Sequence, residues 1–246
     1  MKKMFRDRRG QFVIIAVLMI AVMIISIGAL MHRAVTYYRH EPWEEYLALI
    51  GNIELNSKRL VELSLANYSH TLNQSILKIN LERWKTDIQN IYVGRGVALN
   101  YELANRSYNV DGIIINYFLG LNYSWLKPKS FTAANATFTL NITSIGLTGY
   151  KFTALAFLNL TILNVKANNI NVTVKVEDKI PVAGLGKENF QVKFGNTTIS
   201  IVSVKSRYDS KEALIYIIEC AQDISSTPVT VEVSDLRGIK VIAQYP

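Results

Sequence analysis

The stretch FVIIAVLMIAVMIISIGALM, residues 12–31, is a run of 20 residues with no charge and one polar side chain, Ser26. At about 1.5 Å per helical residue it covers about 30 Å, the thickness of the hydrocarbon core of a bilayer. A secretory signal peptide has a shorter apolar core and a small-x-small cleavage site behind it. Here the run ends in Leu30-Met31-His32-Arg33. We therefore expect a transmembrane helix over residues 11–31 that is uncleaved, or cleaved on its cytoplasmic side.

The orientation of this helix follows from a basic tail in front of it. Residues 1–10 carry five basic side chains against one acidic side chain, a balance of +4, which is half of the net charge of +8. These side chains are Lys2, Lys3, Arg6, Arg8 and Arg9, against Asp7. Loops rich in Lys and Arg stay in the cytoplasm, so we expect residues 1–10 inside the cell membrane and residues 32–246 outside. The basic tail suits anionic lipid headgroups, and no basic face with interleaved aromatic residues indicates nucleic-acid binding.

Nine acceptor sequons for N-glycosylation, Asn-x-Ser or Asn-x-Thr, all lie beyond the apolar run. They begin at Asn67, Asn73, Asn105, Asn122, Asn135, Asn141, Asn159, Asn171 and Asn196. Their number and position predict a glycoprotein whose bulk is extracellular. The alternative is that Asn and Thr are simply frequent in β-rich segments, and Asn141 and Asn159 lie in strand-like runs where one or both could be unmodified.

Residues that commonly carry catalysis are sparse, so we expect no enzyme, cofactor or metal. The three histidines, His32, His40 and His70, have no i, i+4 partner for a zinc site. Cys220 is the only cysteine and is expected to be buried, and no Gly-x-Ser-x-Gly elbow occurs. The paired acids Glu44-Glu45 and Glu177-Asp178 fit a first helical turn and a strand-end turn.

A helical pattern follows the apolar run. Pro42 opens it, and apolar residues then recur at spacings of three and four through residues 43–92, until Gly94-Arg-Gly96. An unbroken helix would be a stalk of about 75 Å at about 1.5 Å per residue. The polar interval 67–74 could instead hold a turn that folds the segment into a hairpin. Either form needs another surface for its apolar stripe: another helix, the β-rich part or a second chain.

From about Tyr108 the period changes to two, which is typical of half-buried strands. The expected strands are 113–118, 136–143, 156–163, 170–176, 190–194, 198–204, 213–220, 229–233 and 239–243. Asp111-Gly112, Leu147-Thr-Gly149 and Lys127-Pro-Lys129 are the expected turns. The fold class is therefore α+β: a transmembrane helix, a helical stalk or hairpin, and an antiparallel β-sandwich head. The expected domains are 1–10, 11–31, 32–96 (juxtamembrane segment and stalk), 97–168 (first β-rich region) and 169–246 (sandwich).

Residues 172–190, VTVKVEDKIPVAGLGKENF, resemble the first hairpin of immunoglobulin-like domains in prokaryotic surface proteins. The resemblance rests on a strand that ends in an acidic turn, then Pro-Val-x-Gly-Leu and a Phe. It implies an immunoglobulin-like fold for about the last third of the chain, although one cysteine cannot form the inter-sheet disulfide of antibody domains. A shared fold does not specify a ligand.

Arg8-Arg9-Gly10-Gln11 before an apolar helix resembles the class III signal peptides of archaeal type IV pilin-like proteins. In that family a membrane peptidase cuts after the Gly, here between Gly10 and Gln11, and the apolar helix packs into a filament core. The fifth residue after that position is Ile15, where the family usually has Glu. The alternative is that the basic residues only set the topology.

These observations favour a single-pass prokaryotic envelope protein that acts outside the cell by adhesion or assembly, and the resemblance at Arg8-Arg9-Gly10-Gln11 implies an archaeal source. Its expected partners are the membrane, other envelope or surface proteins, and copies of itself through the anchor helix or stalk. A pilin-like filament or secretion subunit processed after Gly10 is the second hypothesis. An extracellular ligand-binding protein or enzyme is the third.

Overall fold

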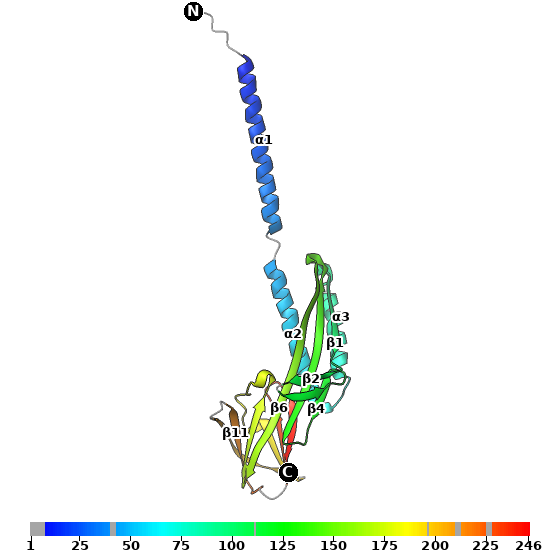
Figure 1. Cartoon of the computed structure of the whole chain (residues 1–246), viewed down its shortest axis with the longest axis vertical. Coiled ribbons are helices and arrows are strands. Elements are labelled where there is room, and N and C mark those ends of the chain that lie inside the picture. The colour runs from blue at the N-terminus through cyan, green and yellow to red at the C-terminus, as the bar shows by residue number, and fades with distance from the viewer. Residues whose placement is uncertain (1–7, 40–42, 111, 196, 210–212, 225–227) are drawn as a thin grey trace, which may run out of the picture. The chain divides into compact units, whose positions relative to one another are not determined.

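The computed structural model describes residues 8–39, 43–110, 112–195, 197–209, 213–224 and 228–246 (Figure 1). This part of the chain is α+β, with an N-terminal apolar helix, two further α-helices and antiparallel sheets. The chain divides into two compact units, of which the first ends at Asn52 and the second comprises Ile53–Pro246. The expected boundary at residue 96 therefore does not separate the compact units.

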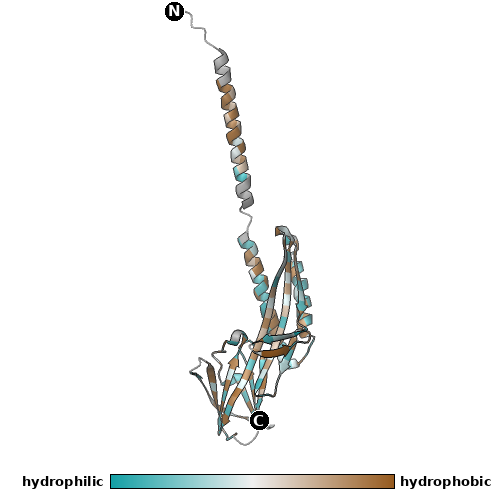
Figure 2. Cartoon of the chain, viewed as in Figure 1, coloured by the Kyte–Doolittle hydropathy of each residue, from teal (hydrophilic) through white to brown (hydrophobic). Residues whose placement is uncertain are grey.

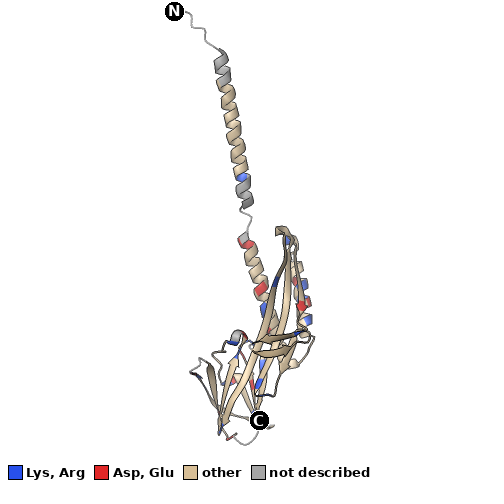
Figure 3. Cartoon of the chain, viewed as in Figure 1, with Lys and Arg blue, Asp and Glu red and all other residues tan. Residues whose placement is uncertain are grey.

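The first unit consists mainly of α1 (Arg8–Arg39), which contains the apolar run. Its stretch Ile14–Arg33 is long and apolar enough to cross a membrane, and none of it is buried. Figure 2 shows the apolar character along this helix, and Figure 3 shows that charge returns only towards its end. α2 (Trp43–Thr71) begins in this unit with Glu44 and Glu45 in its first turn, as the sequence predicts.

From Ile53 onward α2 belongs to the second unit, where it pairs with α3 (Ile76–Ile91). Two fully buried serines of α2 accept hydrogen bonds from α3: Asn80 Nδ2 donates to Ser64 Oγ at 2.9 Å, and Trp84 Nε1 donates to Ser57 Oγ at 2.9 Å. This order of contacts makes the two helices antiparallel. The polar interval 67–74 therefore contains a turn, and a continuous rod over residues 43–92 does not form.

The larger sheet has seven strands in the order β1-β5-β6-β7-β11-β10, with β4 also beside β5. Their bounds are β1 (Val97–Leu103), β4 (Leu121–Ser124), β5 (Lys129–Ile142), β6 (Leu147–Lys166), β7 (Asn169–Lys175), β10 (Ile201–Tyr208) and β11 (Leu214–Cys220). β6 pairs with β5 from Leu147 to Thr161 and with β7 from Asn159 to Lys166. One sheet thus includes strands from both expected β regions, 97–168 and 169–246.

The smaller sheets complete the second unit. One has the order β13-β12-β8-β9, and the other is the β2-β3 hairpin. Their bounds are β2 (Ser107–Val110), β3 (Ile113–Asn116), β8 (Phe190–Phe194), β9 (Thr197–Ile199), β12 (Val229–Ser234) and β13 (Lys240–Tyr245). Short 3-10 helices are η1 (Val93–Arg95), η2 (Thr143–Ile145), η3 (Glu177–Lys179) and η4 (Lys187–Asn189). Thr132 Oγ1 of β5 donates to the Lys240 carbonyl at 2.8 Å, which ties the four-stranded sheet to the larger one.

Both faces of β5 and β6 are covered near their middle. On one face the rings of Phe138 and Phe152 stack with centroids 5.0 Å apart, beside four fully buried alanines. These are Ala134, Ala136, Ala154 and Ala156. On the other face Phe131, Ala133 and Phe157 pack with residues of and beside the β2-β3 hairpin, including Ile115 and Tyr117. Successive strand residues point to opposite faces, so a strand covered on both faces buries consecutive residues.

Each expected strand overlaps an observed one, but one expected turn is wrong. The chain reverses at η2 and Gly146, and Leu147-Thr-Gly149 forms the start of β6 instead of a turn. Gly149 has a φ of +72°, and its N–H donates to Asn141 Oδ1 at 2.6 Å, where the β5-β6 register shifts. This glycine therefore serves an irregularity inside a strand pair. The expected strand 198–204 divides into β9 and β10.

We expect Gly120→Ala to destabilise the second unit strongly. Gly120 has a φ of +76°, and an added Cβ would lie 2.8 Å from the Asn135 carbonyl oxygen and 2.9 Å from Leu77 Cδ2. The left-handed backbone costs about 1–2 kcal/mol for a residue with a Cβ, and overpacking adds about 1–3 kcal/mol. Gly146→Ala is the matched control, because Gly146 has a φ of +67° and nothing within 4 Å of the added Cβ.

Denaturant unfolding of the full chain in detergent measures both variants. G120A is expected to lose about 1–3 kcal/mol more free energy of unfolding than G146A. Equal losses would show that the backbone conformation alone matters and that the contact of Gly120 with Asn135 and Leu77 does not.

Candidate functional site

The structure distributes the nine sequons over very different environments. Asn67, Asn73 and Asn105 are exposed. Asn122, Asn141 and Asn171 are half-buried, and Asn196 lies outside the described residues. Asn135 and Asn159 are only 6% and 5% exposed. Asn67, Asn73 and Asn105 are therefore the asparagines that can carry a glycan without any change in the fold.

Hydrogen bonds sharpen this ranking, because N-glycosylation replaces a hydrogen on Nδ2 of the side chain. Asn159 Nδ2 donates to the Ser130 carbonyl at 2.9 Å, and its Oδ1 accepts from Thr161 Oγ1 at 3.1 Å. Asn122 Nδ2 donates to the Asn116 carbonyl at 2.7 Å. Both side-chain amides therefore already donate hydrogen bonds within the fold. The Thr of the Asn159 sequon is itself the donor to that asparagine.

The candidate cleavage pair, Gly10 and Gln11, lies near the start of α1, which begins at Arg8. Their side chains are outside the described part of the structure.

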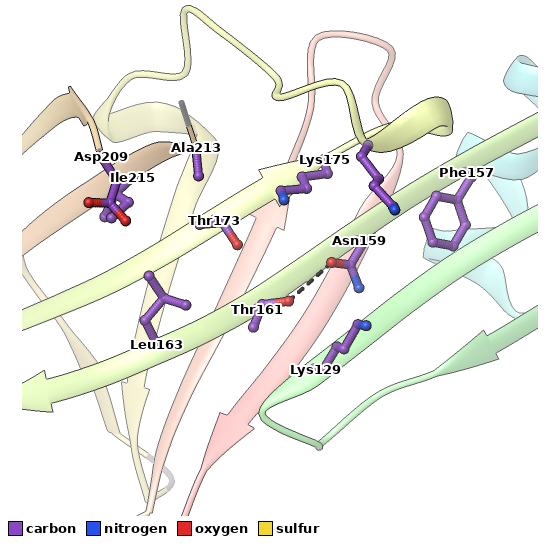
Figure 4. A pocket seen from close by; sticks show the side chains of 11 residues that line it. Lys129, Phe157, Asn159, Thr161, Leu163, Thr173, Lys175, Asp209, Ala213 and Ile215 are labelled. Atoms are coloured by element: carbon purple, nitrogen blue, oxygen red, sulfur yellow. Dashed lines mark hydrogen bonds between the residues drawn. The ribbon is translucent and has the colours of Figure 1, made fainter. Parts of the chain in front are cut away.

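A groove on one face of the larger sheet has a volume of about 340 Å³ (Figure 4). Successive strand residues point to opposite faces of a sheet, so every second residue lines the groove. The residues on this face are Lys129 of β5, every second residue of β6 from Phe157 to Leu163, and Thr173 and Lys175 of β7. Its lining residues are Lys129, Phe157, Asn159, Thr161, Leu163, Thr173, Lys175, Lys179, Asp209, Ala213 and Ile215.

Cross-strand pairing fixes the order of polar groups in this groove. Lys129 lies opposite Thr161, and Lys175 lies opposite Asn159. Thr161 also lies opposite Thr173. Figure 4 accordingly shows two lysines on either side of an amide and hydroxyl pair. Three lysines against one aspartate line the groove, so its formal charge is positive.

Arg237 is the centre of a second polar cluster, on the turn between β12 and β13. Its Nε lies 2.8 Å from Asp235 Oδ2, and its Nη1 lies 3.1 Å from Glu62 Oε1 of α2 and 3.6 Å from Glu177 Oε1 of η3. Its Nη2 donates to the Phe157 carbonyl of β6 at 3.0 Å. The Phe157 N–H in turn donates to Glu177 Oε1. One guanidinium thus joins a helix, a strand, a 3-10 turn and a hairpin.

Burial and charge oppose each other in the pKa values of this cluster. Burial alone would lower the pKa of Arg237, but Asp235, Glu177 and Glu62 together raise it above its ordinary value. Burial raises the pKa of Glu177, and the charge of Arg237 only partly offsets that effect. Close by, the buried Tyr117 hydroxyl has no hydrogen-bond partner among the described residues. Burial, then the charge of Glu177, raises the pKa of that tyrosine.

Neither cluster is a metal site in the part of the chain that the structure describes. Within the described ranges, no group of three or more His, Cys, Asp or Glu residues could hold a metal ion. His70 Nε2 lies 3.1 Å from the Gly238 carbonyl, and His40 lies outside the described residues. Cys220 is buried, as expected, and burial raises its pKa, which disfavours a reactive thiolate. The cluster at Arg237 therefore acts as a structural junction.

Comparisons with protein-family models, with curated proteins and with solved structures find no match to this chain. The site is accordingly described from its own geometry.

Sequence reasoning found neither the groove nor the Arg237 junction. Glu62 and Arg237 are 175 positions apart, and the three groove lysines come from three separate segments. The only local signal was polar residues at every second position of a strand, as in Asn159, Thr161 and Thr173, which also fits an ordinary solvated face.

Arg237→Met is expected to lower the free energy of unfolding by about 3–5 kcal/mol, because it leaves partly buried carboxylates without their cation. Arg237→Lys keeps the charge but not the fork of donors, so we expect an intermediate loss. Lys58→Met is the control, since it removes the exposed pair of Lys58 with Glu54 at 2.7 Å and should cost about 0.2–0.5 kcal/mol. Similar losses for R237M and K58M in denaturant unfolding would contradict the junction role.

Glu177→Gln tests the raised pKa of Glu177. A raised pKa means that the folded chain holds the proton more tightly than the unfolded chain does. The contribution of Glu177 to the free energy of unfolding is therefore complete below a pH of about 4.3, which is the pKa of Glu in the unfolded chain. It is lost as the pH rises through the pKa of Glu177 in the folded chain. Gln does not titrate, yet it can still accept from the Phe157 N–H. We therefore expect E177Q to gain stability relative to the natural chain as pH rises from about 4 to neutral.

The measurement is denaturant unfolding of both chains at a series of pH values. A relative stability of E177Q that falls with rising pH would show instead that the Arg237 contact stabilises the ionised Glu177 carboxylate.

Proposed function

We propose that this chain is a single-pass membrane protein of the cell envelope, anchored by α1. The exposed surface of α1 supports this proposal: thirteen large apolar side chains between Ile14 and Met31 are each more than half exposed. Transfer of one such side chain out of water is worth about 1.5–3 kcal/mol, so this surface needs a cover. A bilayer supplies that cover, and a helix satisfies its own backbone groups within it.

The proposed orientation places the N-terminus in the cytoplasm and residues 32–246 outside the cell. The positive balance of residues 1–10 supports it, as do the exposed sequons at Asn67, Asn73 and Asn105. We propose glycans at these three positions first, since Asn135 and Asn159 are buried.

The outer part is proposed to act by adhesion or assembly through an immunoglobulin-like β-sandwich. Buried and less buried residues alternate along β12 and β13, as in the inner layer of a sandwich. Phe190 of β8 contacts Tyr216 of β11 in the other sheet, with ring centroids 5.6 Å apart. β10 and β9 end their sheets, and such edge strands can pair with a strand of another protein.

The exposed surface of α1 also favours the second candidate, a pilin-like filament or secretion subunit. In that case the α1 helices of other copies would cover the apolar surface, after cleavage between Gly10 and Gln11. The third candidate, an extracellular ligand-binding protein, draws support from the groove over β5, β6 and β7. We propose no catalytic residue in any of these cases.

Labelling of introduced cysteines on intact cells tests the topology. Cys220 is the only native cysteine and is buried, so the natural chain should react little with a membrane-impermeant maleimide. Asn73→Cys should be labelled on intact cells, because Asn73 is exposed in the part proposed to lie outside. Lys3→Cys should be labelled only after the cells are broken. Labelling of K3C but not N73C on intact cells would reverse the orientation.

Intact mass and N-terminal sequencing of the membrane-extracted protein separate the first two candidates. The anchor hypothesis predicts a chain that retains Met1, whereas the filament hypothesis predicts a chain that begins at Gln11. Recovery of the protein in the soluble fraction, without detergent, would refute both.

A further inference from the structure

The groove over β5, β6 and β7 combines basic side chains with short polar ones. Lys129, Lys175 and Lys179 reach it from β5, β7 and η3. Among the described residues, Lys129 and Lys175 have no ion pair with any carboxylate. Lys129 is exposed and Lys175 is half-buried, and they lie on either side of the Asn159 and Thr161 side chains (Figure 4).

The floor of the groove is rich in short hydrogen-bonding side chains. Thr161 donates its hydroxyl hydrogen to Asn159, which leaves the oxygen of Thr161 able to accept another. Asn159 is only 5% exposed; one Nδ2 hydrogen goes to the Ser130 carbonyl, and the second has no acceptor among the described residues. Thr173 adds a further hydroxyl at the same level.

Leu163 gives the groove an apolar wall, and its side chain is 45% exposed. The volume of about 340 Å³ lies at the small end of ligand pockets, which run from about 300 to 1,000 Å³. The groove therefore suits a compact ligand with one apolar face, several hydroxyl groups and a negative charge.

We propose that this groove binds an acidic saccharide, one or two sugar units that carry a carboxylate or sulfate. The C–H face of a sugar ring would pack on Leu163, its hydroxyls would exchange hydrogen bonds with Asn159, Thr161 and Thr173, and its acid group would pair with Lys129 and Lys175. Charged hydrogen bonds of this kind are the strong ones in such a site. Asp209 at the β10 side of the lining would exclude a ligand that is acidic along its whole length.

The choice of a saccharide rests on the proposed extracellular location, because acidic glycans are exposed there. The expectation that the groove binds an anion does not depend on that location. The proposal also requires Asn159 to be unmodified, although it begins a sequon. Its glycan would occupy the same space as the ligand, and peptide mass mapping of the native protein therefore provides the first test. A glycan on Asn159 would overturn the proposal.

The binding test uses the purified full chain in detergent micelles and isothermal titration calorimetry. The probes are galacturonic acid, its methyl ester, a singly sulfated disaccharide and inorganic sulfate. We expect the acid or the sulfated sugar to bind, the ester to bind at least about ten-fold more weakly, and affinity to fall as salt is raised. Equal affinity for acid and ester, no binding of either acidic sugar, or inorganic sulfate binding as tightly as the sugars would overturn the proposal.

Charge-removing variants locate the site. Lys129→Gln and Lys175→Gln should each weaken binding by about ten-fold or more, because a hydrogen bond to a charged group is lost. Lys151→Gln is the matched control, since Lys151 is an exposed lysine of β6 that does not line the groove. All three side chains are at least partly exposed, so their unfolding midpoints should equal that of the natural chain. Equal weakening by K151Q and K129Q would refute the site.

This binding assay is independent of the topology test. Failure of the groove to bind leaves the cysteine-labelling result intact, and an inverted topology leaves the calorimetry intact.

Discussion

The edge of β6 at Phe157, which pairs with no strand, is the point at which a helix, a 3-10 turn and a hairpin meet the larger sheet. β6 pairs with β5 along its first part, and β7 joins its other edge only from Asn159 onward. The N–H and carbonyl of Phe157 would otherwise be unpaired at this edge, and they are bound by Glu177 and Arg237. A buried backbone group without a partner costs about as much as a lost hydrogen bond. Because Arg237 also contacts Glu62, the closure of this edge fixes α2 against the sheet.

The elements that the sequence predicts well are those whose signal is local. The apolar run 12–31 lies inside α1, and the spacing of three and four residues lies inside α2 and α3. β8 coincides with the expected strand 190–194, because its alternation is bounded by turn residues on both sides. In each case the deciding residues are neighbours in the chain, so composition and period carry the information.

The errors arise where tertiary contacts decide. The sequence predicts a turn at Leu147-Thr-Gly149, whereas the positive φ of Gly149 serves the register shift beside Asn141 inside the β5-β6 pair. Asn135 and Asn159 matched a surface sequon, yet β5 and β6 are covered on both faces there, so either parity of residue is buried. Period-two alternation cannot reveal a second cover, since the covering hairpin β2-β3 comes from a different part of the chain.

The same difference between local and tertiary signals explains why the sequence predicts the membrane anchor but not the groove. An anchor needs only length and apolarity in one helix, and no partner residue elsewhere in the chain has to be found. A groove needs strands from β5, β6 and β7 in register, and its lysines acquire a common neighbour only after that register is set. The cover of β5 and β6 by the β2-β3 hairpin stops short of Lys129 and Thr161, so the face that remains open is the part where charged and hydroxyl side chains replace apolar ones. Two of these polar side chains, Asn159 and Thr173, are buried, and Asn159 forms its hydrogen bonds with Ser130 and Thr161, which lowers the cost of burying an amide.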